Sequence, residues 1–184
     1  MHEPVIVTRP NTDTPALPLV FDSPHSGFVY PEDMRAVVPE IILRQSEDAF
    51  IDALFGHATV LGATLVKATF PRCYIDPNRS TDDVQTNAID GVWPHPVVNS
   101  VKTDRGAGLC WTKILGETSI YDRKLSVEDV ENRIENYWRP YHDALSAELD
   151  RLHETFGAVW HINCHSMPAK GNIHTEDGPV ERAD

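Results

Sequence analysis

The sequence lacks the features that would assign its 184 residues to a membrane or to nucleic acid. It has no apolar run near the length of about 18 residues that a membrane-spanning helix needs. Its start, MHEPVIVTRP, lacks the basic and then apolar pattern of a signal peptide. Positive charge is scarce, with 16 Lys and Arg against 28 Asp and Glu. The net charge of −12 repels polyanions, so we expect a cytoplasmic protein with no nucleic-acid or membrane partner.

Cysteine is also sparse. Cys73, Cys110 and Cys164 lie far apart, and no two of them form a CxxC pair. This pattern argues against a zinc ribbon or a redox pair and predicts buried free thiols. A chain of this length can bury about 70% of the surface of its unfolded form, which is sufficient for one hydrophobic core. We therefore expect residues 1–184 to form a single domain.

Five apolar segments rich in β-branched residues, each bounded by Gly, Pro or Asp, predict strands. These segments are Pro4–Val7, Leu17–Phe21, Ala63–Phe70, Leu109–Ile114 and Ala158–Cys164. The second and the last are almost continuously hydrophobic, which is typical of central strands covered on both faces. Strands alternating with helices predict an α/β fold of three layers with a largely parallel or mixed sheet. Functional sites in such sheets lie beyond the carboxyl ends of the strands.

Two segments between the strands have helical periodicity. Apolar residues recur at helical spacing between residues 39 and 62, which predicts that Phe50 and Leu54 lie on a buried stripe. A longer stripe begins after the capping residue Ser126 and ends near Gly157. Pro140 lies inside it, so the helix either kinks there or consists of two helices that meet. Residues 77–108 are polar and predict a functional loop.

Two His-Ser pairs lie in turns just past predicted strands, and they place His25 and His165 at strand ends that can converge. Neutral imidazoles bind zinc well, and a catalytic zinc ion has three protein ligands and one open position. The adjacent carboxylates of Glu47 and Asp48 offer the third ligand. The buried stripe favours Asp48, but helical phase alone does not decide between them. The alternatives are a structural role for the histidines and a solvated face for the acids.

A possible anion site follows another apolar segment, in the run Asp76-Pro77-Asn78-Arg79. The guanidinium of Arg79 can bind a carboxylate through two parallel hydrogen bonds, and Asn78 can add a further polar contact. Arg72 is an additional candidate. An acidic protein needs such a local cationic cluster if its substrate is an anion. The alternative is a surface turn with a solvated arginine.

Six motifs, which span most of the chain in order, resemble those of the N-formylglutamate amidohydrolases. They are SPHSG at 23–27, SED at 46–48, CYIDPNR at 73–79, RGAGL at 105–109, PYH at 140–142 and HSMP at 165–168. The resemblance implies a fold similar to that of the zinc carboxypeptidases. It also implies hydrolysis of N-formyl-L-glutamate to formate and L-glutamate in histidine degradation. The implied zinc ligands, for one ion per chain, are His25, Asp48 and His165. Asn78 and Arg79 would hold a carboxylate of this small anionic N-acyl amino acid.

The sequence departs from the carboxypeptidase pattern at Phe28, which stands three residues after the first histidine, where those enzymes have their carboxylate ligand. This departure favours Asp48 as the ligand and leaves Glu47 as the alternative. A serine nucleophile is a minor alternative, because neither Ser26 nor Ser166 lies in a GxSxG elbow.

A second departure concerns the end of the chain, because family members continue beyond HSMP with a strand whose glutamate is thought to act as general base. We therefore expect a C-terminally incomplete domain whose general base lies beyond Asp184 and which binds metal but turns over N-formylglutamate poorly. The nearby acids Glu176, Asp177 and Glu181 do not follow a strand. An unpaired sheet edge would make the protein a possible homo-oligomer. Alternative functions are hydrolysis of another N-acyl amino acid or dicarboxylic half-amide, and metal or carboxylate binding without catalysis.

Overall fold

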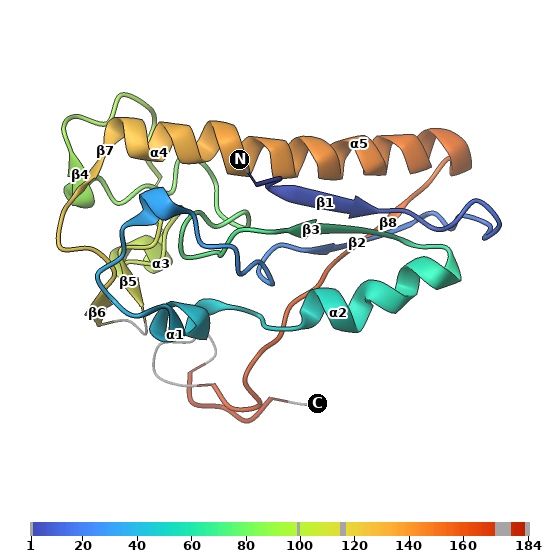
Figure 1. Ribbon diagram of the computed structural model, residues 1–184, viewed down its shortest axis with the longest axis horizontal. Helices are drawn as coiled ribbons and strands as arrows, with labels where there is room; N and C mark the ends of the chain where they lie inside the picture. The colour runs from blue at the N-terminus through green and yellow to red at the C-terminus, as the bar shows by residue number, and fades with distance from the viewer. Residues whose placement is uncertain (1, 99, 115–116, 172–177, 183–184) are drawn as a thin grey trace.

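A four-stranded mixed sheet in the order β1-β3-β2-β8 forms the middle layer of the computed structural model (Figure 1). The structure describes residues 2–98, 100–114, 117–171 and 178–182. The strands of this sheet are β1 (Val5–Thr8), β2 (Leu19–Ser23), β3 (Thr64–Ala68) and β8 (Trp160–Asn163). β2 runs parallel to β3 and to β8, whereas β1 is antiparallel to β3. The predicted α/β class with a mixed sheet is therefore confirmed.

Helices cover the two faces of the sheet (Figure 1). A long rod lies along one face and consists of α4 (Val127–Arg133), a π-helical turn η5 (Ile134–Trp138) and α5 (Arg139–Phe156). The shorter helices α1 (Glu40–Leu43) and α2 (Ile51–Gly56) lie on the opposite side. Among the residues that the structure describes, no helix combines the length and the apolar character that crossing a membrane requires.

Short elements connect these layers and make up the rest of the regular structure. They are η1 (Glu32–Met34), η2 (Arg44–Ser46), η3 (His57–Leu61), η4 (Thr86–Ala88), β4 (Ile89–Asp90), α3 (Val101–Asp104), β5 (Lys113–Ile114), β6 (Thr118–Ser119) and β7 (Leu125–Ser126). Of the predicted strand Leu109–Ile114, only the last two residues are extended, and they pair with β6 outside the main sheet.

The rod begins and ends where its sequence predicts. The Ser126 hydroxyl accepts a hydrogen bond from the Asp129 backbone, and the Asp129 carboxylate accepts one from the Ser126 backbone, which forms a complete capping box. At the other end Gly157 adopts a left-handed conformation with φ of 76°. Pro140 lies in the first turn of α5, directly after the π-helical turn, so the rod is built of joined helical segments that meet at this proline.

The segment between residues 39 and 62 does not form the predicted amphipathic helix. It is divided into short helices, and Phe50 has a φ of 67°, which interrupts any continuous helix. Phe50 and Leu54 are 77% and 70% exposed, so the prediction that they lie on a buried stripe is wrong. The interruption has a structural cause, because the backbone at Asp48 bonds to the loop that follows β2 instead of continuing a helix.

β8 is an edge strand and not the covered central strand that its hydrophobic sequence indicates. Among the described residues it pairs with β2 alone in the main sheet, and all four of its residues are exposed. Trp160 is 74% and Ile162 is 43% exposed. The prediction of a covered strand holds for β2, which lies between β3 and β8.

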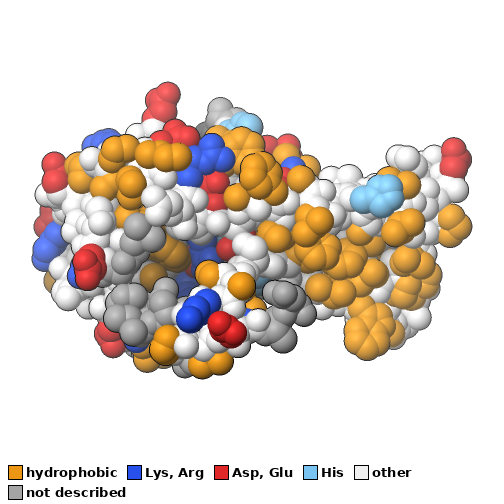
Figure 2. Space-filling view, turned by 90° about the horizontal axis from the view of Figure 1, so that it is seen from below, with side chains coloured by type: hydrophobic (Ala, Val, Ile, Leu, Met, Phe, Trp, Pro, Cys, Tyr) orange, Lys and Arg blue, Asp and Glu red, His pale blue; other side chains and the backbone are white. Residues whose placement is uncertain are grey.

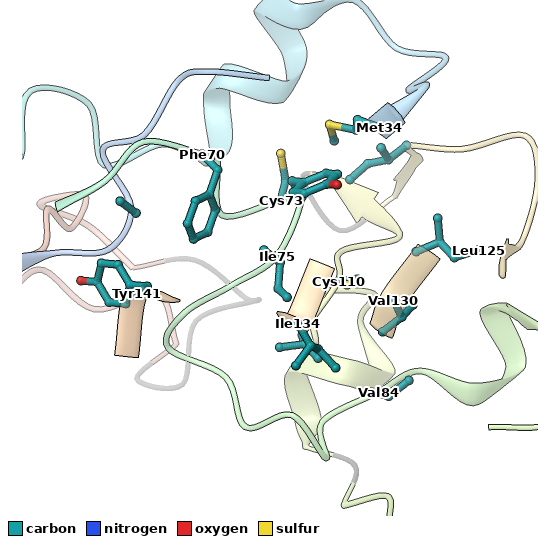
Figure 3. Packing of buried hydrophobic residues seen from close by; sticks show 14 of the residues in the cluster. Met34, Phe70, Cys73, Ile75, Val84, Cys110, Leu125, Val130, Ile134 and Tyr141 are labelled. Carbon is teal, nitrogen blue, oxygen red and sulfur yellow. The ribbon is translucent and has the colours of Figure 1, made fainter. Parts of the chain in front are cut away.

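The hydrophobic core joins the rod to the segment that follows β3. Figure 3 shows Ile134 and Tyr141 of the rod together with Phe70, Cys73 and Ile75. All three cysteines are buried and unpaired, as predicted. The buried Arg133 of α4 donates a hydrogen bond of 2.9 Å to the carbonyl of Tyr74. These contacts fix the chain just before Asp76, where the polar site begins.

Candidate metal centre

Three side chains from remote parts of the sequence meet beyond the carboxyl ends of β2 and β8. The potential ligand atoms of His25, Asp48 and His165 all lie within 4.8 Å of one another. His25 follows β2, His165 follows β8, and Asp48 comes from the connection between η2 and α2. The structure therefore brings together the set of residues that the sequence indicated.

The turn after β2 holds Asp48 in place. The Asp48 backbone N–H donates to the His25 carbonyl at 3.0 Å, and the Ser26 hydroxyl donates to the Asp48 carbonyl, also at 3.0 Å. Gly27 lets this turn approach the strand end, since a Cβ atom there would lie 2.2 Å from the carbonyl oxygen of Phe70. The Ser26 hydroxyl thus has a structural task, which makes a nucleophilic role less suitable for it.

The imidazole of His25 is prepared to bind a cation. Its Nε2–H donates to the buried carboxylate of Asp76 at 2.7 Å, which leaves the lone pair on Nδ1. That Nδ1 atom is buried without a hydrogen-bond partner and lies 3.4 Å from Asp48 Oδ2. A buried polar atom without a partner is unfavourable, and a metal ion bound to Nδ1 would satisfy it.

His165 approaches the same carboxylate oxygen from the other side. Its Nδ1 lies 2.8 Å from Asp48 Oδ2, and its Nε2 lies 2.8 Å from the side-chain amide of Asn78. For Nδ1 to bind a metal, the ring proton must reside on Nε2. A half-turn of the Asn78 amide would then present its oxygen as the acceptor for that proton. The two nitrogen donors and one carboxylate match the three protein ligands of a catalytic zinc site.

The two central carboxylates remain ionised. Burial is the largest influence on the pKa of Asp48 and acts to raise it, but His165, His25 and Arg72 together outweigh burial, so the pKa lies below its usual range. The pKa of Asp76 is also lowered, because His25 and Arg72 outweigh the effect of burial. Arg72 donates to Asp76 Oδ2 at 3.1 Å and lies 3.9 Å from Asp48 Oδ1. The positive charge of Arg72 is thus already paired with these two carboxylates, so Arg72 is less suited to bind substrate.

Arg79 has a different environment. It lies in the turn after Asp76, and its guanidinium has no carboxylate partner among the described residues. Its Nε atom is buried without a hydrogen-bond partner. An arginine with unused donors can bind an anion through charge-assisted hydrogen bonds. Asn78 contacts His165 directly, so it joins the proposed anion site to the metal centre.

The other predicted acids lie apart from this cluster. Glu47 accepts a hydrogen bond from the Tyr30 hydroxyl at 2.8 Å and pairs with Arg44, so its carboxylate is used elsewhere. Glu181 is exposed, and its backbone forms an isolated antiparallel β-bridge with Lys170. Glu176 and Asp177 lie outside the described residues.

Sequence reasoning missed the role of Asp76. It was noted only as part of the turn that carries Arg79, yet it is the hydrogen-bond partner of His25 and is fully buried. A signal was present, because metal-binding histidines usually donate their second N–H to a carboxylate or a carbonyl. An acid that follows a neighbouring strand was therefore the residue to examine.

Comparison with known proteins agrees with the motifs. The sequence model of the N-formylglutamate amidohydrolase family matches residues 17–182. N-formylglutamate deformylase of Pseudomonas putida is 32% identical over 155 residues, which cover 82% of this chain and 52% of that protein. The enzyme of the same name from Pseudomonas aeruginosa is 26% identical, with the same coverage. The chain thus spans about half the length of these curated relatives.

Solved structures give the same result for the fold. The crystal structure of N-formylglutamate amidohydrolase from Ralstonia eutropha JMP134 is 48% identical, with a TM-score of 0.87 over 91% of this chain and 59% of that chain. The gene product Atu2144 of Agrobacterium tumefaciens is 16% identical with a TM-score of 0.60, covering 90% of this chain and 57% of its own, and shows the fold alone. The chain belongs to the N-formylglutamate amidohydrolase family.

Proposed function

We propose that this chain carries the metal centre of a zinc-dependent amidohydrolase that converts N-formyl-L-glutamate to formate and L-glutamate. The observation that carries the proposal is the convergence of His25, Asp48 and His165, with the buried Nδ1 of His25 left without a partner. Membership of the family supplies the substrate class. We further propose action in the cytoplasm, in histidine degradation, and a fold similar to that of the zinc carboxypeptidases.

The ligands would be Nδ1 of both histidines and the carboxylate of Asp48. A zinc ion bound there supplies Lewis-acid activation of the amide carbonyl and of the attacking water. Asp76 keeps the proton of His25 on Nε2 and orients the ring, so the ligand lone pair needs no rearrangement. Arg72 balances the negative charge of the two carboxylates, which limits their mutual repulsion.

Arg79 would bind a carboxylate of the substrate, with Asn78 beside it. Fixing the glutamyl part of the substrate in this way brings the formyl carbon to the metal centre, and such positioning accounts for a large part of enzymatic rate enhancement. We assign the general base to neither Asp48, whose carboxylate would be a metal ligand, nor Asp76, whose carboxylate accepts the Nε2–H of His25.

The test measures zinc and turnover in the same preparations. We expect one zinc ion per chain in the wild type and much less in His25→Ala and His165→Ala, with Glu47→Gln as the matched control that retains zinc. Formate release from N-formyl-L-glutamate should depend on the bound zinc. Equal zinc in the wild type and in both histidine variants would contradict the metal centre.

A second candidate function is metal or carboxylate binding without catalysis. The observation that favours it is that both carboxylates at the centre are engaged by other groups. Stoichiometric zinc together with binding of N-formyl-L-glutamate, but no release of formate, would support this alternative. Faster turnover of another N-acyl amino acid or dicarboxylic half-amide would instead revise the substrate.

A further inference from the structure

The helical rod contacts the turn that carries Arg79. A π-helical turn, Ile134–Trp138, lies between α4 and α5, and such turns inside helices are frequently found at functional sites. The turn ends at Trp138, and His142 follows one helical turn later. Their rings stack with centroids 3.9 Å apart. The tryptophan and the histidine therefore form one paired surface on the rod.

Each ring of this pair donates a hydrogen bond to the same short stretch of backbone. Trp138 Nε1–H donates to the carbonyl of Arg79 at 2.9 Å, and His142 Nε2 bonds to the carbonyl of Pro77, also at 2.9 Å. A carbonyl can only accept, so His142 carries its proton on Nε2. Burial lowers the pKa of His142, although the bond to Pro77 acts in the opposite direction. The two accepting carbonyls flank Asn78.

The opposite edge of this stretch is held by Asp76. Its carboxylate accepts from the Asn78 backbone N–H at 2.9 Å, and its carbonyl accepts from the Arg79 N–H at 3.0 Å. The backbone of the turn is thus fixed by donors from the rod on one side and by acceptors of Asp76 on the other. What remains free to meet a ligand is the side chain of Arg79.

We propose that Trp138 and His142 are positioning residues, which hold the turn Pro77–Arg79 so that the guanidinium of Arg79 faces the carboxylate of the substrate. This inference rests on the proposed function. It assigns a task to the PYH motif and to the π-helical turn before it, neither of which the metal centre uses. The π-helical turn ends at Trp138, the residue that donates to the carbonyl of Arg79.

The variants separate hydrogen bonding from packing. Trp138→Phe and His142→Phe keep a ring but remove the donor, whereas His142→Gln keeps an N–H donor. Asn136→Ala is the matched control, because Asn136 lies in the same π-helical turn and, among the described residues, its side chain bonds only to the carbonyl of Asn132. Titration calorimetry of the zinc-loaded chain with N-formyl-L-glutamate gives the dissociation constant, and metal analysis gives zinc occupancy.

We expect the two phenylalanine variants to bind N-formyl-L-glutamate about 3- to 10-fold more weakly, which corresponds to the loss of one neutral hydrogen bond. His142→Gln and Asn136→Ala should bind nearly as the wild type does, and zinc occupancy should stay unchanged in all four variants. In an Arg79→Lys background, Trp138→Phe should add little, because it acts through Arg79. Wild-type affinity in Trp138→Phe, or fully additive losses in the double variant, would overturn the proposal.

A second measurement separates this inference from the proposed function. Hydrogen exchange at the backbone amides of Asn78 and Arg79 reports directly on the turn, whether or not the ligand is correct. We expect faster exchange at both amides in Trp138→Phe and His142→Phe than in Asn136→Ala. If the wild type does not bind N-formyl-L-glutamate, the proposed function fails, and unchanged exchange in these variants would then refute the positioning role as well.

Discussion

At the scale of single residues, the centre depends on which atom of each side chain is already occupied. Asp76 takes the Nε2–H of His25, so Nδ1 remains as the ligand atom. Arg72 contacts both central carboxylates, whereas Arg79 keeps its donors available. Two arginines seven positions apart therefore have different tasks, and the difference follows from their hydrogen-bond partners.

Replacing Asp76 by Asn should weaken zinc binding by about 10- to 100-fold, as is typical when the partner of a metal-binding histidine is changed. An amide can still accept from Nε2–H, but it lacks the charge that makes the imidazole a better donor to the metal. Competition with a chelator measures the affinity. The exposed residue Asp150 provides the control, Asp150→Asn, which should bind zinc as the wild type does. Equal affinities in the two variants would remove Asp76 from this role.

Replacing Arg79 by Lys should raise KM for N-formyl-L-glutamate about tenfold to a hundredfold, with a smaller effect on kcat. A lysine keeps the charge but loses the planar pair of donors that fits a carboxylate. Zinc occupancy should not change. Steady-state kinetics over a range of substrate concentrations is the measurement, and an unaltered KM would show that the substrate carboxylate binds elsewhere.

At the scale of structural elements, the turn after β2 connects the sheet to the ligand on the η2–α2 connection. In this turn the His25 carbonyl accepts a hydrogen bond from the Asp48 backbone N–H, and the Ser26 hydroxyl donates one to the Asp48 carbonyl. The turn can approach the backbone that follows β3 only because Gly27 has no side chain. Stability and metal binding are therefore coupled at this position.

Gly27→Ala should destabilise the protein by about 1–3 kcal/mol, because the new Cβ would overlap the backbone of Thr69 and Phe70. Gly56→Ala is the matched control: a Cβ there meets nothing within 4 Å, and alanine favours a helix, so it should be neutral or slightly stabilising. Thermal unfolding compares the two variants with the wild type. If Gly27→Ala melts at the wild-type temperature, the turn must be able to move away from β3.

At the scale of the whole molecule, the fold presents an unpaired edge and an apolar surface. Within the part of the chain that the structure describes, β8 pairs with β2 alone in the main sheet, and Trp160 is 74% exposed. Figure 2 shows hydrophobic side chains gathered on the face seen from below, toward the end that carries α2. Leu54 of α2 and Leu61 of η3 are 70% and 66% exposed. Exposed edges and apolar patches of this kind favour association.

We expect this chain to self-associate with increasing concentration through β8. Sedimentation velocity over a range of concentrations measures the association, and Trp160→Lys should reduce it, because a charge on an edge strand opposes strand pairing. Val92→Lys is the control, since Val92 is 90% exposed but lies outside the main sheet. A monomer at every concentration, or an equal effect of both lysines, would show that β8 is not the contact.

The sequence by itself determined the features that depend on neighbouring residues. The capping box at Ser126, the helix end at Gly157, the central strand β2 and the buried thiols all follow from patterns within a few residues. The two strand-end histidines are also local, because a turn after a hydrophobic run places its first polar residues at the edge of the sheet.

Only the tertiary structure decided which acids serve the centre and which strand lies at the edge. Asp48 was preferred to Glu47 on the basis of a buried helical stripe that does not exist. What turns Asp48 toward the histidines is its backbone bond to His25, 23 positions earlier, while Tyr30 holds Glu47. The exposure of β8 and the role of Asp76 likewise depend on contacts between distant segments. Contacts between segments that are distant in the sequence depend on the whole fold, so local sequence periodicity cannot predict them.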